Sequence, residues 1–129
     1  MKVPKIFSFR GKSVEQIKQM SIEEFSRLIT ARERRAIKRG LTEPQKKLLE
    51  QIKKHPQDFH KTHVREMIIL PQMIGSKIGI YTGKEWVQLN VTAEMLGFRL
   101  GDFAPVSKRV KHSAPGVGAT RGSKHIELK

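Results

Sequence analysis

Residues 32–39 carry five cationic side chains and a single acid, Glu33. The cations are Arg32, Arg34, Arg35, Lys38 and Arg39. On a helix, Arg32, Arg35 and Arg39 form one strip and the other two cations form a neighbouring strip. The planar guanidinium group of arginine matches a phosphate in bidentate contact. The alternative is a solvated helix face, but such faces usually carry interspersed acids, so the cluster favours contact with nucleic-acid phosphates.

A second set of cationic side chains lies in residues 104–129, among glycine, serine and proline. These candidates for RNA contact are Lys108, Arg109, Lys111, His112, Arg121 and Lys124. Glycine allows the backbone to approach phosphates closely. We expect this tail to be disordered alone and to become ordered on RNA. The alternative is a tail that only increases solubility.

Other chemistries find little support in the sequence. His60 and His63 lie three residues apart, but a zinc site needs further ligands and the chain has no cysteine. Gly116, Gly118 and Gly122 have the spacing G-x-G-x-x-x-G, and no strand and helix follow to complete a dinucleotide-binding unit. No G-x-S-x-G nucleophile motif is present. We therefore predict no cofactor, no metal site and no enzymatic activity.

The charge of the chain is segregated along its length. Residues 1–54 hold 15 Lys/Arg against 6 Asp/Glu, residues 55–103 hold 5 against 5, and residues 104–129 hold 6 against 1. This distribution predicts a neutral centre that packs and two basic arms that bind a polyanion. No apolar run reaches the ~18 residues of a membrane span. We expect a soluble cytoplasmic protein with no membrane partner.

The first third of the chain has the sequence signals of helices. Three pairs fit the S/T-x-x-E/Q capping box: Ser13 with Gln16, Ser21 with Glu24, and Thr42 with Gln45. Apolar residues at helical spacing predict one helix from Ser21 to near Gly40, where glycine permits the left-handed end of a helix. A second helix is expected over residues 43–54.

The middle of the chain changes to strand-like patterns. Residues 65–70, 78–81 and 86–91 are expected as strands, and Gly83 supports a tight hairpin between the last two. A short helix is expected over residues 92–96. Three strands with helices against one face predict an α+β fold with a small three-stranded antiparallel sheet.

These elements divide the chain into three predicted parts. Residues 1–33 form a basic helical N-terminal extension, residues 34–103 form the α+β RNA-binding core, and residues 104–129 form an extended basic tail. Most aromatic side chains are expected in the core. Tyr81 and Trp86 flank the hairpin tip, where exposure would allow them to stack on bases.

Three motifs in the central part occur together. They are Ile69-Leu70-Pro71-x-Met73-Ile74-Gly75, Tyr81-Thr82-Gly83-Lys84, and Met95-Leu96-Gly97-x-x-Leu100-Gly101-Asp102-Phe103. In combination they closely resemble the universal small-subunit ribosomal protein nineteen family in its archaeal and eukaryotic form. The segment RRAIKRGL at residues 34–41 is also similar to the family, and GVGATR at residues 116–121 resembles its archaeal branch.

The resemblance implies a structural protein of the head of the small ribosomal subunit. It implies binding to small-subunit ribosomal RNA, a neighbouring small-subunit ribosomal protein thirteen, and a tail directed toward the decoding region and bound tRNA. Beyond the two cationic arms, the RNA contacts that it implies are Lys61, His63, Arg65, Lys77, Lys84 and Arg99. The sequence departs from the family at Phe98, where His is frequent, and at Thr82, where Asn is frequent.

Two other classes of protein remain open from the residues alone. A DNA-packaging protein shares the basic charge, but it would bind duplex DNA as well as RNA. An RNA-processing enzyme would need a metal or acid–base site, with His60 or His63 as the first candidates.

Overall fold

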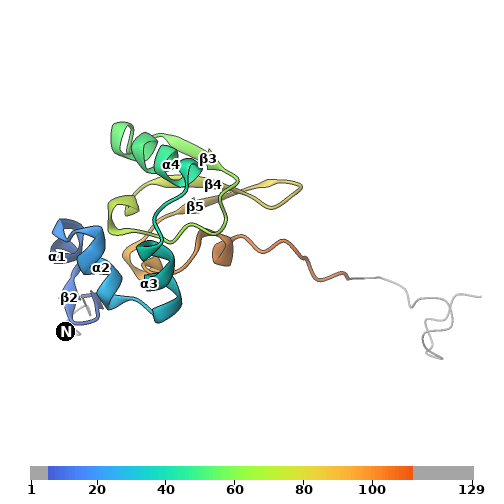
Figure 1. The fold of residues 1–129 in the computed structure, drawn as a ribbon. Coiled ribbons are helices and arrows are strands. Elements are labelled where there is room, and N and C mark those ends of the chain that lie inside the picture. Colours follow the sequence, from blue (N-terminus) through green and yellow to red (C-terminus); the bar gives the residue numbers. More distant parts are fainter. Residues whose placement is uncertain (1–5, 112–129) are drawn as a thin grey trace, which may run out of the picture.

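The computed structural model describes residues 6–111 as four α-helices, a two-stranded ribbon and a three-stranded sheet (Figure 1). In chain order the elements are β1 (Ser8–Phe9), β2 (Lys12–Ser13), α1 (Val14–Gln19), α2 (Ile22–Leu28), α3 (Ala31–Lys38), α4 (Glu43–Lys54), β3 (Phe59–Thr62), β4 (Lys77–Tyr81) and β5 (Trp86–Asn90). Short 3-10 turns cover Pro71–Met73, Ala93–Met95 and Leu100–Phe103. The α+β class predicted from the sequence is confirmed.

The three-stranded sheet has the order β3-β4-β5 and is mixed. The β4–β5 pair is the expected antiparallel hairpin, with Tyr81 opposite Trp86 and with Gly83 at a positive φ of 97° in the turn. The β3–β4 pair is parallel, which corrects the expected all-antiparallel sheet. A parallel pair needs a long connection, and residues 63–76 provide one.

The prediction that residues 65–70 form a strand of this sheet is wrong. Met67–Leu70 are all buried, so they lack the alternation of a half-exposed strand. Their segment crosses the core and forms one isolated bridge, between Ile68 and Arg99. The Ile69 N–H donates to the Phe98 carbonyl at 2.8 Å, which ties this segment to the chain that follows the sheet. Its place at the edge of the sheet is taken by β3.

The predicted capping boxes define the starts of three helices. The Ser13 hydroxyl accepts from the Gln16 N–H, and the Ser13 N–H donates to the Gln16 side chain. Ser21 and Glu24 make the same reciprocal pair at the start of α2. At α4 the Thr42 N–H donates to the amide oxygen of Gln45 at 3.1 Å. These local signals are confirmed because their partners lie within one helical turn.

The single helix expected from Ser21 to Gly40 is divided into α2 and α3. Ile29 and Thr30 have ψ values of 172° and 159°, which are extended and end the helical run. The two helices then pack against each other. The expected end near Gly40 is correct, since Gly40 follows α3 with a positive φ of 91°.

One hydrophobic core joins the helices to the sheet. Ile17 and Phe25 from the N-terminal helices are fully buried in the same cluster as Leu48 of α4 and Ile78 and Ile80 of β4. Figure 1 shows α4 running alongside β3, while the described part of the C-terminal segment extends away from this body. The core therefore includes residues on both sides of the boundary predicted after residue 33, and α2 packs against α3.

Candidate nucleic-acid interface

Helix α3 presents most of the predicted cationic cluster to solvent. None of its residues is buried, and Arg32, Arg35, Lys38 and the following Arg39 are exposed. The strip formed by Arg32, Arg35 and Arg39 is thus accessible to a ligand along the length of the helix. Glu33 is partly buried and its carboxylate is engaged elsewhere, so it does not neutralise this strip.

Arg34 differs from the other cations of α3 because its side chain turns back onto α2. The Arg34 Nε–H donates to the Ser26 carbonyl at 3.2 Å, and Nη2 donates to the carbonyls of Arg27 (3.2 Å) and Ile29 (3.1 Å). The last carbonyls of a helix lack partners within the helix, and a guanidinium group with several donors can satisfy them. Arg34 therefore stabilises the break between α2 and α3.

Arg65 has a similar structural role at the end of the sheet. Its Nη1 donates to the Tyr81 carbonyl at 2.9 Å, and its Nη2 donates to the carbonyls of Gly101 (3.2 Å) and Ala104. The guanidinium group thus joins β4 to the 3-10 turn before the tail. With these donors occupied and the side chain only partly exposed, Arg65 has less capacity for a phosphate than an exposed arginine.

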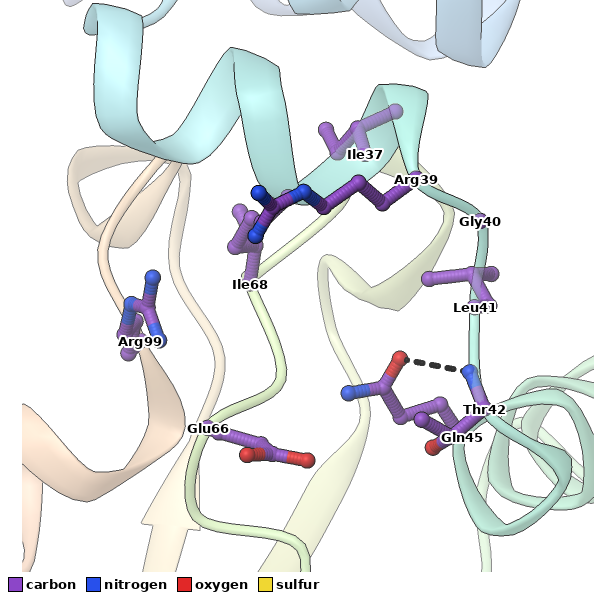
Figure 2. Close-up of a pocket in the computed structure, with 10 residues that line it drawn as sticks. Ile37, Arg39, Gly40, Leu41, Thr42, Gln45, Glu66, Ile68 and Arg99 are labelled. Atoms are coloured by element: carbon purple, nitrogen blue, oxygen red, sulfur yellow. Dashed lines mark hydrogen bonds between the residues drawn. The ribbon is translucent and has the colours of Figure 1, made fainter.

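Arg99 lies in a pocket beside the end of α3. Figure 2 shows Arg99 on one side of this pocket and Leu41 and Gln45 on the other, with the Arg39 side chain reaching over Ile68. The Arg99 Nε is 3.6 Å from the Glu33 carboxylate, and both side chains are largely covered. The pocket is lined by two cations, Arg39 and Arg99, and by the Glu66 carboxylate, so its charge does not indicate an anionic ligand.

The remaining cations predicted in the core lie on the sheet. Lys61 of β3, His63 just after it, Lys77 of β4 and Lys84 in the hairpin turn are all exposed. Of the two aromatic residues that flank the hairpin tip, Trp86 is 38% exposed, whereas Tyr81 is only partly exposed.

The two histidines considered for a metal site do not face each other as on a helical turn. His60 is 8% exposed, and its Nε2 lies 2.8 Å from the His55 carbonyl oxygen. The His63 ring instead packs against Tyr81 and Trp86. Among residues 6–111, no three His, Cys, Asp or Glu side chains gather as metal ligands.

The first residues of the tail contact the hairpin. Lys108 and Arg109 are exposed, as is Lys111, and the Lys108 Nζ is 2.5 Å from the Glu85 carboxylate. The hydrogen bond from Lys108 and its positive charge lower the pKa of Glu85 below its ordinary value. The predicted RNA contacts His112, Arg121 and Lys124 and the tail glycines lie outside the described residues.

A pH titration tests the contact between the tail and the hairpin. Because the pKa of Glu85 is lowered, the ion pair is fully formed above the ordinary carboxyl pKa and is lost as pH falls through the lowered value. We expect Lys108→Ala to raise the Glu85 pKa toward its ordinary value in an NMR titration of the side-chain carboxyl carbon. Arg109→Ala is the matched control and should leave that pKa unchanged. An equal pKa of Glu85 in wild type and Lys108→Ala would contradict the contact.

Arg34 and Arg65 have structural roles that no sequence pattern indicates. The bonds of Arg34 and Arg65 to backbone carbonyls leave no pattern in the sequence, because every residue type supplies the same carbonyl. Phe59 is 43% exposed, although it was expected in the core. The exposure of Phe59 follows the alternation of a strand. Phe59, Lys61 and His63 are exposed, whereas His60 and Thr62 between them are buried.

In the described part of the chain, no helix has the length and apolar character to cross a membrane. The model of the family described as Ribosomal protein S19 matches residues 35–112. The chain is 46% identical over 123 residues to the small ribosomal subunit protein uS19 of Methanococcoides burtonii, covering 95% of this chain and 89% of that protein. It is 43% identical over 130 residues to the protein of the same name from Saccharolobus solfataricus, covering 97% and 93% of the two chains. These similarities confirm the family resemblance drawn from the three sequence motifs, and the chain therefore belongs to the ribosomal protein S19 family, a family of structural ribosomal proteins and not of enzymes.

Proposed function

We propose that this protein binds small-subunit ribosomal RNA in the head of the small ribosomal subunit. The observation that carries the proposal is the exposed strip Arg32, Arg35 and Arg39 on α3, a helix with no buried residue, in a chain of this family. The α+β body holds this strip in a fixed orientation. The chain would act in the cytoplasm as part of the ribosome.

The mechanism of binding follows from the placement of the cations. Exposed Lys and Arg side chains replace the counterions that are condensed on the RNA phosphates, and the release of those ions favours association. A rigid helix strip contacts successive phosphates, and the exposed Lys84 extends the contact to the hairpin turn. A-form RNA is recognised mainly through its backbone and shape, so the site needs no base code on α3.

Two finer proposals concern the neighbours of the protein in the subunit. We propose that small-subunit ribosomal protein thirteen lies beside it and that its tail is directed toward the decoding region and bound tRNA. The basic residues Lys108, Arg109 and Lys111 at the start of the tail support contact with RNA along that path, since all three side chains are exposed. Crosslinking from residue 111 in assembled ribosomes would identify the neighbours of the tail.

Binding to purified nucleic acids tests the RNA-binding proposal. The protein should bind a transcript of the head domain of small-subunit ribosomal RNA more tightly than an unrelated folded RNA or a DNA duplex of equal length. The logarithm of its affinity should fall linearly with the logarithm of salt concentration. Equal affinities for all three nucleic acids would contradict the proposal and favour a general packaging protein.

A further inference from the structure

The face of the three-stranded sheet turned away from the core forms a continuous surface. Strand register places Lys77 between Phe59 and Asn90, then Gly79 between Lys61 and Gln88, and then Tyr81 beside Trp86. His63 follows β3 at the same end as Tyr81 and Trp86. The alternate residues Ile78 and Ile80 are fully buried on the opposite face. We call these nine residues the outer sheet face: Phe59, Lys61, His63, Lys77, Gly79, Tyr81, Trp86, Gln88 and Asn90.

Two aromatic side chains on this face remain partly open to solvent. Phe59 is 43% exposed and Trp86 is 38% exposed. The Trp86 ring packs against two neighbouring rings, since its centroid lies 5.0 Å from those of His63 and Tyr81. An aromatic ring that is open to solvent can stack on a nucleic-acid base, because every base has a π face.

The Phe59 ring packs against Gly79, which lies opposite Lys61 in the sheet. A Cβ atom at Gly79 would lie 2.5 Å from Phe59 Cζ, so the ring rests directly on the backbone of β4. Gly79 is buried under it despite its position on the outer sheet face. The absence of a side chain at this position therefore lets the tip of the Phe59 ring lie against the backbone of β4, while the residue stays 43% exposed.

The charge of the outer sheet face selects the ligand. Its side chains include two lysines and a histidine and no acid, and the Lys61 Nζ lies 5.5 Å from the centroid of the Trp86 ring. Lys77 is exposed at the end of the face where Phe59 lies. The nearby Glu85 is paired with Lys108. Aromatic rings interleaved with cations fit a single-stranded nucleic acid, whose bases stack on rings while its phosphates contact lysines.

We propose that the outer sheet face binds unpaired nucleotides of RNA, with one base stacked on Trp86 and another on Phe59. Lys61 and Lys77 contact the phosphates that flank these bases. Phe59 pairs with Lys77 and Trp86 pairs with Tyr81. These partners lie four residues apart on β4, so the two rings are separated by about 13 Å along the strand. This inference rests on the proposed function and deepens it, because α3 contacts backbone phosphates whereas this face holds bases.

Fluorescence tests the stacking directly, since Trp86 is the only tryptophan of the chain. The probe is octauridylate, a single strand whose bases do not pair with one another, and heparin serves as a polyanion without bases. Stacking should quench Trp86 emission with octauridylate and leave it nearly unchanged with heparin at equal saturation. Equal quenching by both ligands, or none with bound octauridylate, would overturn the proposal.

Substitutions separate stacking from phosphate contact. Trp86→Ala and Phe59→Ala should each weaken binding of labelled octauridylate about five- to a hundredfold, with an unchanged salt slope. Lys61→Ala and Lys77→Ala should each reduce the salt slope by about one. Trp86→Phe retains a ring and should restore most of the affinity, and Gly79→Ala should resemble Phe59→Ala because its methyl group displaces the ring.

Each outcome distinguishes this inference from the proposed function. Thermal unfolding confirms first that Trp86→Phe and Gly79→Ala are folded. Unchanged octauridylate affinity in Trp86→Ala and Phe59→Ala overturns base stacking, while tight binding of the head-domain transcript leaves the proposed function standing. If the same variants bind RNA normally but enter the subunit poorly, the outer sheet face contacts a protein and base stacking is again excluded. Loss of all RNA binding in the wild type would remove both proposals.

Discussion

Replacing Arg32, Arg35 and Arg39 together by alanine is expected to weaken binding to the head-domain transcript about ten- to a hundredfold at moderate salt. The three exposed side chains form one strip of α3, and each should neutralise one phosphate. The slope of log affinity against log salt should therefore fall by about three. Arg34 is left in place because its hydrogen bonds hold the end of α2, and its loss would confuse binding with folding.

The matched control for this variant removes the same charge from another helix. Lys46, Lys47 and Lys53 are exposed on α4, so their joint replacement by alanine changes the net charge equally. We expect this control to lose much less affinity and to retain most of the salt slope. Equal losses in the two triple variants would show that the protein responds only to total charge and would refute a specific α3 contact.

Arg65→Ala is expected to produce the largest loss of stability among single substitutions of the cations. It removes the donors of three backbone carbonyls, those of Tyr81, Gly101 and Ala104, which join the sheet to the segment before the tail. Leaving such partly buried acceptors unpaired should lower the free energy of unfolding by about 2–4 kcal/mol. Urea unfolding followed by circular dichroism measures this change.

Two further variants establish the cause of that loss. Arg65→Lys should recover little stability, because one ammonium group cannot reproduce the fork of donors that reaches three carbonyls. Lys61→Ala, at an exposed position on the sheet, should change the free energy of unfolding by no more than about 0.5 kcal/mol. A loss in Arg65→Ala as small as that of Lys61→Ala would mean that the three hydrogen bonds contribute little.

The features that could be predicted from the sequence are those set by near neighbours in the chain. Capping boxes at Ser13 and Ser21 and the hairpin at Gly83 were all correct, because the groups that stabilise them lie within a few residues. The exposure of Trp86 beside that hairpin followed from the same local geometry. The cationic side chains of α3 were placed on a helix by the same kind of signal.

The features that could not be predicted depend on groups distant in sequence. The periodicity of apolar residues continues through Ile29, and the hydrogen bonds from Arg34 to the Ser26 and Ile29 carbonyls stabilise the division of the helix there. The parallel strand β3 gains its partners from β4, on the far side of a long connection, and its polar residues gave a weak local signal. The cationic residues Arg65 and Lys61 look alike in the sequence, yet one is bonded to three carbonyls and the other is exposed.

Sedimentation of cell lysate through a sucrose gradient tests most directly whether this protein is a constituent of the small ribosomal subunit. The position and amount of the chain would be followed at moderate and at high salt. We predict that it migrates with the small subunit at one copy per particle and stays there at high salt, since an integral protein is held by many contacts besides screened charges. Release at high salt, or migration with DNA or as free protein, would contradict this account.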